Sequence, residues 1–456
     1  MKILRILVPL VVVLGVGFIA FAVWPTKTPP LHAVKTDDPA LVERGRYLAR
    51  AGDCTACHTA VDGVAFAGGL PLASPIGTIY SSNITPDREH GIGDYTLDDF
   101  DRAVRHGIAP GGRTLYPAMP YPSYAKVSDD DIVALYAYFM HGVAPAAEPN
   151  RKTDIPWPLS MRWPLGAWRK LYAPEVKAVD TAKYADAKIA RGAYLVQGLG
   201  HCGSCHTPRA LTLQEKGLDE SSAEFLAGGP LIDGWVAVNL RGNAADGLGN
   251  WSSEALVETL RSARSPGHAV IGGAMGDVVV HSTQHLNDED LQAIAVYLKS
   301  LPASAHEASS FAASPATAQA LQAGLNEGRG AELYVDNCAA CHRTDGAGYA
   351  KAFPKLAGNP SVLSEDPSSM IRLVLAGASL PGTTAAPSPL GMPGFAWRLS
   401  DDETAQLVSF IRNSWGNKAP AVQANQVRKI RGELDMESRT HEGSSGAKPK
   451  EKDGKT

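Results

Sequence analysis

The chain places all of its cysteines in three copies of one short motif, Cys-x-x-Cys-His. The copies are CTACH at residues 54–58, CGSCH at residues 202–206 and CAACH at residues 338–342. The chain has 6 cysteines in total, so none is left over for a structural disulfide. The fold therefore has to present three separate sites, each built from two thiols and an imidazole.

The sequence before each motif also repeats. A helical stretch carries an Arg-Gly pair and ends just before the cysteines. A glycine inside a helix costs about 1 kcal/mol relative to alanine. We therefore expect these glycines where a second helix approaches closely. They are Gly45, Gly192 and Gly330.

Each copy closes in the same way, with a short polar residue and acids before an apolar run at helical spacing. This pattern predicts an N-cap followed by an amphipathic helix. The N-cap residues are Ser128, Asn287 and Ser400. Between motif and closing helix, residues 91–96 match residues 247–252, and each of these stretches precedes a short helix. The third copy lacks this insert, and its middle helix is expected at residues 369–376.

The motifs recur about every 140 residues, a period that suits whole domains better than a solenoid. Proline-rich and alanine-rich stretches separate the copies. After residue 416 the chain turns polar and charged, which is typical of disorder. The predicted parts are a signal or anchor segment with spacer at 1–30, domains at 36–145, 181–302 and 321–416, linkers at 146–180 and 303–320, and a disordered tail at 417–456.

The N-terminus is a targeting segment. Lys2 and Arg5 precede an apolar run at residues 6–24. The small residues at 20–22 fit a signal-peptide cleavage site, whereas the run is almost long enough for a retained membrane anchor. Both interpretations export the body of the chain, because the positive residues stay inside. The formal net charge of −4 gives no support for a nucleic-acid partner.

The Cys-x-x-Cys-His motif is the attachment signature of c-type haem. Two thiols about one helical turn apart reach the two vinyl groups at one edge of a porphyrin, and the adjacent histidine binds iron. A redox pair or a zinc site also uses Cys-x-x-Cys, but neither requires histidine directly after the second cysteine in every copy. The sequence predicts three covalently attached haem c groups. Their thioether residues are Cys54, Cys57, Cys202, Cys205, Cys338 and Cys341, with His58, His206 and His342 on the iron.

Methionine is the expected second iron ligand, since a thioether suits an electron-transfer haem. Met119 and Met392 lie in proline-containing loops before the closing helices, where backbone rigidity aims the sulfur. Met140 and Met370 lie within helical stretches and are expected to pack in the core. The second copy offers Met275.

Other side chains compete for roles near the haems. His281 and His285 follow Met275 and are expected to make polar loop contacts, with bis-histidine ligation as the alternative. His201 is expected to be an exposed neighbour of Cys202. Asn83 and Asn239 are expected to form turns, with a hydrogen bond to a haem propionate as the alternative.

The sequence resembles the three-haem cytochrome c subunits of bacterial membrane-bound dehydrogenases, which act on alcohols, gluconate, sorbitol and fructose. Beyond the motifs, the resemblance is carried by YPAMPYPSY at 116–124, DIPWPLSMRW at 154–163, GHCGSCHTP at 200–208 and FIRNSWG at 410–416. It implies a mainly α fold of three tandem cytochrome c-like domains with irregular loops, after an N-terminal hydrophobic helix.

The resemblance also implies partners and a place in the cell. A catalytic dehydrogenase subunit with flavin, pyrroloquinoline quinone or molybdenum would supply electrons. The chain would pass them to ubiquinone or another respiratory carrier, at the periplasmic face of the inner membrane. The chain would then be no enzyme by itself. A haem peroxidase with an open iron position, and a cytochrome array that feeds a terminal oxidase, are the alternatives.

Overall fold

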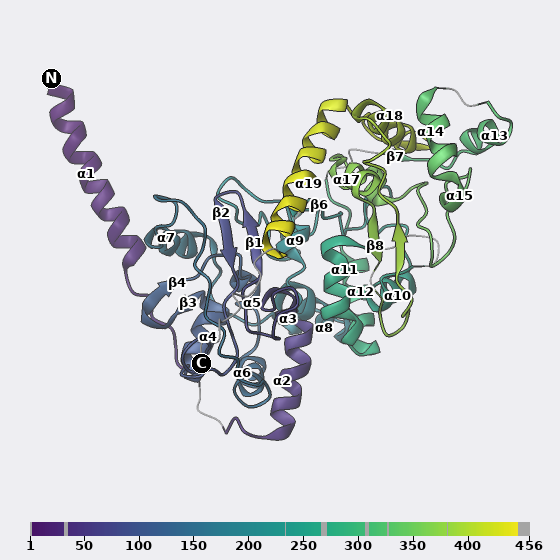
Figure 1. The fold of residues 1–456 in the computed structure, drawn as a ribbon. Helices are drawn as coiled ribbons and strands as arrows, with labels where there is room; N and C mark the ends of the chain where they lie inside the picture. Colours follow the sequence, from purple (N-terminus) through teal and green to yellow (C-terminus); the bar gives the residue numbers. More distant parts are fainter. Residues whose placement is uncertain are drawn as a thin grey trace, which may run out of the picture. The chain divides into compact units, whose positions relative to one another are not determined.

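The computed structural model describes residues 2–31, 35–232, 234–265, 271–305, 310–325, 328–380 and 382–445 (Figure 1). Two compact units divide the chain. Unit 1 comprises Met1–Pro230 and Asp277–Pro302, and unit 2 comprises Leu231–Gly276 and Ala303–Thr456. Helices with irregular loops dominate both units, and all described strands form two-stranded sheets. The prediction of a mainly α chain with irregular loops is confirmed, whereas the three domain boundaries stay a prediction.

Unit 1 holds the first two cysteine motifs. Its elements are α1 (Lys2–Val23), α2 (Pro39–Ala51), α3 (Cys54–Cys57), β1 (Pro71–Ser74), β2 (Gly77–Tyr80), α4 (Leu97–His106), β3 (Ile108–Ala109), η1 (Pro110–Gly112), β4 (Arg113–Thr114), α5 (Tyr121–Tyr124), α6 (Asp129–His141), α7 (Trp163–Tyr172), η2 (Thr181–Lys183), α8 (Ala187–Tyr194), η3 (Leu195–Leu199), α9 (Gly203–His206), η4 (Thr283–His285) and α12 (Asp288–Ser300). Helix α11 (Gly273–His281) runs across the division between the units.

Unit 2 holds the third motif. Its elements are β5 (Leu231–Ile232), β6 (Trp235–Val236), α10 (Ser253–Ser262), β7 (Ser310–Phe311), α13 (Ala316–Gln322), α14 (Arg329–Asn337), α15 (Ala339–His342), α16 (Pro360–Leu363), α17 (Ser368–Ala376), β8 (Ala378–Leu380), β9 (Leu390–Met392), α18 (Asp401–Arg412), β10 (Asn417–Lys418) and α19 (Ala424–Ser445). The predicted middle helix of the third copy is confirmed as α17.

Three helix pairs share one kind of crossing: α2 with α6, α8 with α12, and α14 with α18. At each crossing a glycine faces the backbone of the closing helix. A Cβ atom there would lie 1.9 Å from the Ala134 oxygen at Gly45, 2.0 Å from the Ala293 oxygen at Gly192 and 2.5 Å from the Gln406 oxygen at Gly330. These distances are too short for any side chain, so the predicted role of the glycines in close helix approach is confirmed.

The closing helices begin where the sequence predicts. The side chains of Ser128, Asn287 and Ser400 each accept a hydrogen bond from a first-turn backbone amide of α6, α12 and α18, respectively. Each leading arginine also pairs with an acid in this turn. The pairs are Arg44–Asp131 at 2.5 Å, Arg191–Asp290 at 2.7 Å and Arg329–Glu403 at 2.8 Å. The cap and the ion pair together fix the start of each closing helix against its leading helix.

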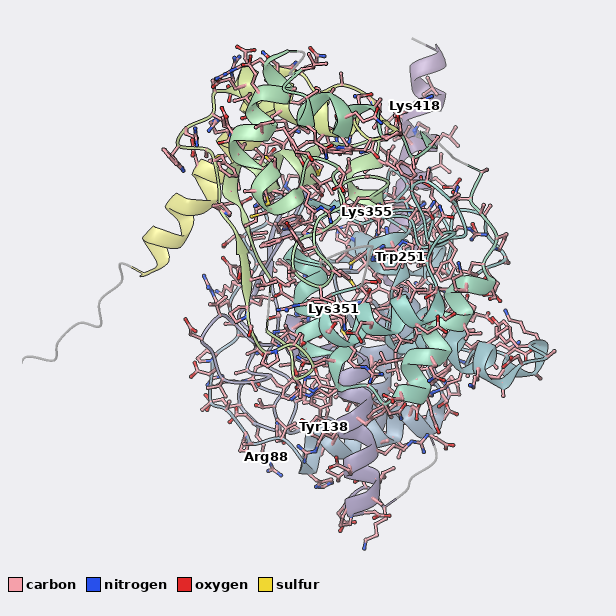
Figure 2. All side chains as sticks on the ribbon, turned by 90° about the vertical axis from the view of Figure 1, so that its right-hand side faces the viewer. Arg88, Tyr138, Trp251, Lys351, Lys355 and Lys418 are labelled. Carbon is pink, nitrogen blue, oxygen red and sulfur yellow. The ribbon has the colours of Figure 1, made fainter. Side chains whose placement is uncertain are left out.

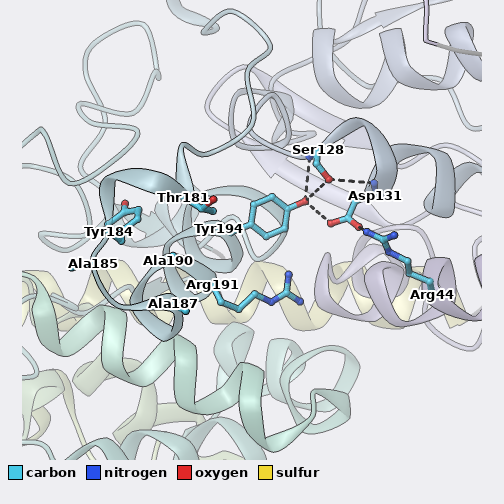
Figure 3. A pocket seen from close by; sticks show the side chains of 10 residues that line it. All are labelled: Arg44, Ser128, Asp131, Thr181, Tyr184, Ala185, Ala187, Ala190, Arg191 and Tyr194. Atoms are coloured by element: carbon cyan, nitrogen blue, oxygen red, sulfur yellow. Dashed lines mark hydrogen bonds and ion pairs between the residues drawn. The ribbon is translucent and has the colours of Figure 1, made fainter.

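In unit 1, each of the first two copies has a tyrosine that donates a hydrogen bond to an acid of the other copy. The Tyr194 hydroxyl donates to Asp131 Oδ2 at 2.5 Å, and the Tyr47 hydroxyl donates to Asp290 Oδ2 at 2.6 Å. Figure 3 shows the Tyr194 hydroxyl between Ser128 and Asp131, with the Arg44 guanidinium beyond the carboxylate. The surrounding hollow has a volume of ≈ 570 Å³. These reciprocal bonds hold the two copies together.

The predicted N-terminal hydrophobic helix is present as α1. Its last turns lie against α7, where Phe18 contacts the Trp163 ring edge-on at 5.9 Å. Lys170 Nζ donates to the carbonyls of Phe21 and Trp24, which stabilises the C-terminal end of the helix. Most of its other described side chains are apolar and exposed. In the part of the chain that was described, no helix combines the length and the hydropathy of a membrane crossing.

The prediction of a disordered tail is wrong for residues 417–445. Strand β10 pairs with β7, and α19 packs against α17 and α18. Val427 is 0% exposed and Ile430 is 4% exposed, because they lie on one face of the helix. The polar composition of the segment hides this short apolar stripe. Residues 446–456 lie outside the described residues.

Candidate functional site

Each cysteine motif begins a short helix, and the carbonyl of its histidine holds a downstream loop. The loop glycine donates its amide to that carbonyl in all three copies. The bonds are Gly68 to His58 at 2.8 Å, Gly228 to His206 at 2.9 Å and Gly348 to His342 at 3.2 Å. The three motifs therefore share their backbone environment as well as their spacing.

The imidazoles of His58 and His342 are oriented by backbone carbonyls. His58 Nδ1 lies 2.7 Å from the Ser82 oxygen, and His342 Nδ1 lies 3.0 Å from the Pro354 oxygen. A carbonyl only accepts, so Nδ1 carries the hydrogen and Nε2 keeps its lone pair. Burial lowers the pKa of both imidazoles, which keeps them neutral. A neutral imidazole with a carbonyl behind it is the arrangement that suits a metal ligand.

The first thiol of each motif is held in its protonated form. Burial raises the pKa of the Cys54, Cys202 and Cys338 thiols to about 12. The repeated motif, with an oriented imidazole in its first and third copies, fits a haem attached by thioethers.

Met119 lies in unit 1 with the first motif. Its amide donates to the Tyr116 carbonyl at 3.2 Å, and its own carbonyl accepts the Tyr121 amide at 2.8 Å, so a tight turn fixes the residue. The Met119 and Cys54 side chains pack against the same apolar cluster of unit 1. Met140 is also packed against this cluster, from α6, which confirms its predicted place at the core.

Met392 lies in unit 2 with the third motif, at the end of β9. Its backbone pairs with Ala378, and a Cβ atom on Gly377 would lie 2.3 Å from the Met392 oxygen. The absence of a side chain at Gly377 therefore permits the close approach of the Met392 backbone. Met370 on α17 is buried in the core of this unit, as predicted.

The two iron ligands predicted for the second copy belong to different units. His206 is buried in unit 1, and Met275 is half-buried in the first turn of α11, in unit 2. The pairing of these two residues stays a prediction of the sequence. His285 Nε2 lies 3.1 Å from the Val280 carbonyl, in agreement with the predicted polar loop contact, and His281 ends α11.

The asparagines form turns. Asn83 Oδ1 accepts the Thr85 amide at 2.9 Å, and Asn239 Oδ1 accepts the Arg241 amide at 2.8 Å. Both asparagines are buried and their amide nitrogens have protein acceptors, for instance Asn83 Nδ2 on the Ala146 carbonyl at 2.8 Å. The predicted turn-forming role is confirmed for both residues.

Tyr124 is a residue whose role the sequence did not reveal. Its hydroxyl donates to the Gly52 carbonyl at 3.0 Å, next to the first motif. Its ring contacts the His201 ring edge-on at 5.6 Å, next to the second motif. The prediction that His201 is an exposed neighbour is wrong, because this ring packs between the two motifs and also bonds the Gly52 backbone.

Comparisons with known proteins address the family of the chain. The cytochrome c family profile matches residues 189–302 and 328–415, and a cytochrome c carries covalently bound haem c. The gluconate 2-dehydrogenase cytochrome c subunit of Pantoea cypripedii is 55% identical over 413 residues, 90% of this chain and 93% of the relative. The alcohol dehydrogenase (quinone) cytochrome c subunit of Gluconobacter oxydans (strain 621H) is 52% identical over 88% of this chain and 84% of the relative.

A more distant relative extends the pattern. The fructose dehydrogenase cytochrome subunit of Gluconobacter japonicus is 36% identical, over 89% of this chain and 85% of the relative. Such high coverage at this identity means that the whole arrangement is shared, not one motif alone. The chain therefore belongs to the family of dehydrogenase cytochrome c subunits, which are electron-transfer subunits rather than catalytic ones.

Proposed function

We propose that this chain carries three covalently attached haem c groups and conducts electrons between them. Each haem, when bound, supplies a one-electron iron couple. The thioether residues are Cys54 and Cys57, Cys202 and Cys205, and Cys338 and Cys341. The iron ligands are His58 with Met119, His206 with Met275, and His342 with Met392.

The oriented imidazole is the observation that carries the proposal. A carbonyl accepts the hydrogen of His58 Nδ1, and another accepts that of His342 Nδ1. Nε2 of each neutral ring therefore keeps a lone pair that can bind iron. The shared glycine-to-histidine backbone bond extends the pattern to the motif of His206. A chance Cys-x-x-Cys-His sequence has no reason to repeat these contacts.

The partners follow from the relatives. Their names assign them to dehydrogenases of gluconate, fructose and, with a quinone, alcohol. We infer that a catalytic subunit with flavin, pyrroloquinoline quinone or molybdenum reduces this chain, and that ubiquinone or another respiratory carrier accepts the electrons. Helix α1 would hold the chain at the periplasmic face of the inner membrane. Cleavage of this segment as a signal peptide is the alternative.

Haem counting tests the first part of the proposal. The intact mass of the mature chain should exceed the polypeptide mass by three haem groups, and a pyridine haemochrome assay should give the same count. A mass that corresponds to fewer than three haems would refute it. N-terminal sequencing of the same sample distinguishes a retained α1 from a cleaved one.

Ligand substitutions test the second part. Met119→Leu and Met392→Leu should each remove one sulfur-to-iron charge-transfer band and lower one midpoint potential. The matched controls are Met140→Leu and Met370→Leu, which lie at the cores of the same units. If a control loses the band and its partner does not, the assignment of ligands is wrong.

A further inference from the structure

The segments that precede the first two cysteine motifs lie against each other in unit 1. A Cβ atom on Gly52 would lie 3.6 Å from the Cys54 sulfur and 3.6 Å from Leu199 Cδ2. Leu199 ends η3, shortly before Cys202, and is 1% exposed. A Cβ atom on Gly200 would in turn lie 3.6 Å from the Cys202 sulfur. The first cysteine of each motif therefore lies close to the contact between the two copies.

An aromatic contact spans this meeting of the copies. The Tyr124 hydroxyl donates to the Gly52 carbonyl at 3.0 Å, and the Tyr124 ring contacts the His201 ring edge-on at 5.6 Å. The His201 imidazole also bonds the Gly52 backbone. The Gly52 amide already donates to the Leu48 carbonyl at 2.8 Å, which leaves the Gly52 carbonyl as the acceptor. We refer to Tyr124, His201 and the Gly52 carbonyl as the Tyr124–His201 bridge.

The backbone of His201 is held in an uncommon conformation. Its φ of 36° lies in the left-handed region, where a residue other than glycine is strained. Asp53, directly before the first motif, also has a left-handed φ, of 52°, whereas Asn337, directly before the third motif, ends α14. Such strain persists where surrounding contacts impose it, and it is concentrated at functional sites. The contacts of His201 with Gly52 and Tyr124 are contacts of this kind.

The bridge closes a short path between two attachment cysteines. Gly52 lies two residues before Cys54 in the chain, and His201 is adjacent to Cys202. One hydrogen bond, from His201 to Gly52, therefore connects the two cysteines through a short stretch of backbone on either side. Because thioethers would join both cysteines to porphyrins, the path would run from one haem edge to the other. Electronic coupling falls steeply across empty space and more slowly through covalent bonds, hydrogen bonds and packed rings.

The surroundings of Tyr124 allow it to couple two redox groups without being oxidised itself. Tyr124 is 8% exposed and belongs to the apolar cluster that includes Leu199 and contacts Cys54. Its hydroxyl donates to a carbonyl, which is too weak a base to take up the phenol proton. A tyrosine that cannot release its proton is hard to oxidise. The ring therefore serves as a fixed medium between the copies.

We propose that the Tyr124–His201 bridge is the route by which electrons cross between the first and second haems. The inference rests on the proposed three-haem function and adds the residues that join two of the haems. Each crossing moves one electron: the donor iron is oxidised by one electron, the acceptor iron is reduced by one, and no proton moves. The protein's contribution is to place the two redox groups and the medium between them.

Flash photoreduction of the full-length, haem-loaded chain tests the route. In the loaded chain every native cysteine is bound to haem, so a cysteine introduced by Arg88→Cys is the only free thiol. The Arg88 side chain is 84% exposed in the first copy, where a ruthenium photosensitiser can be attached (Figure 2). A flash injects one electron, and transient absorbance follows its passage from the first haem, identified by the spectral component that Met119→Leu alters. The rate should be the same in deuterated water, since no proton moves.

Two substitutions in this labelled background remove the bridge in steps. His201→Gly removes the ring and the hydrogen bond, and glycine adopts a left-handed φ without strain, so the loop keeps its course. It should slow the transfer between the first two haems at least severalfold. Tyr124→Phe keeps the packed ring and removes the hydroxyl, so it should slow the transfer less. Tyr138→Phe is the control with wild-type transfer, because Tyr138 is 7% exposed in the same apolar cluster and contacts Phe66 and Phe139 instead.

Midpoint potentials and iron-to-iron distances from pulsed electron paramagnetic resonance separate the route from other effects. Slower transfer in His201→Gly at wild-type potentials and distance supports the route. An unchanged rate in His201→Gly overturns it, and so does a rate in Tyr138→Phe that falls equally far. A rate that falls only in proportion to a longer distance or a smaller driving force also overturns it, because the bridge would then merely space the haems. A haem count below three refutes the proposed function instead.

Discussion

Replacing Gly45 by alanine should destabilise unit 1, although alanine is the better helix former. A Cβ atom at this position would lie 1.9 Å from the Ala134 oxygen and 2.7 Å from the Tyr138 Cβ. Ordinary van der Waals contact begins near 3.4 Å. The obstacle at Ala134 is a backbone carbonyl inside α6, which cannot rotate away as a side chain would. The two helices must therefore separate to admit the methyl group.

The expected magnitude is the difference between two terms. Alanine gains about 1 kcal/mol in helix propensity relative to glycine. Overpacking a tight contact costs about 1–3 kcal/mol, and a backbone obstacle places this crossing at the upper end. The net loss of unfolding free energy is then about 2 kcal/mol. For a unit of this size, such a loss lowers the melting temperature by about 4–8 °C.

Thermal unfolding followed by far-ultraviolet circular dichroism measures the change. The control is Gly432→Ala in α19, where a Cβ atom would meet nothing within 4 Å. This control should be as stable as the wild type or more stable, by up to about 1 kcal/mol. If Gly45→Ala melts at the wild-type temperature or above, the close approach of α2 and α6 is not what requires glycine. Gly192→Ala should behave as Gly45→Ala does, because its contact is 2.0 Å.

Three further predictions address other contacts. Tyr194→Phe removes a hydrogen bond to the buried Asp131 carboxylate and should cost about 1.5–3 kcal/mol in urea unfolding. Ile430→Ala should lower the free energy of unfolding by about 2–5 kcal/mol in the same assay, since this side chain of α19 is 4% exposed. A change near zero would mean that α19 does not pack against unit 2. Burial acts to raise the pKa of Asp290, but its bond with Arg191 holds the pKa below the ordinary value. Stability from this acid is therefore complete above about pH 4 and lost as the pH falls further, and Asp290→Asn should show a shallower acid decline of melting temperature.

Local sequence signals predicted the helices and their starts. An N-cap needs one short polar side chain and one amide three residues on, and both are visible in the sequence at Ser128, Asn287 and Ser400. The glycines at the crossings were also predictable from the local sequence. Glycine weakens a helix, so a glycine that recurs in each leading helix indicates that a second helix packs closely there. The same signals placed Met370 in the core of unit 2.

Long-range contacts were not predictable. Tyr47 bonds Asp290 across 243 residues, and Tyr124 contacts His201 from a separate helix. Neither contact has a local pattern, since any exposed or buried tyrosine would look the same in the sequence. Helix α19 was missed for a different reason: its apolar stripe is too sparse to outweigh the charged residues around it.

The repeat itself nevertheless contains information about which copies join. The residue three positions after the leading arginine is Tyr47 in the first copy and Tyr194 in the second, and each bonds the acid of the other copy. In the third copy this position is Glu332, which pairs with its own Arg329 at 3.1 Å. A carboxylate cannot donate a hydrogen bond to a second carboxylate, so the third copy cannot form the same reciprocal bond. The change of one side chain from donor to acceptor thus restricts the reciprocal bond to the first two copies.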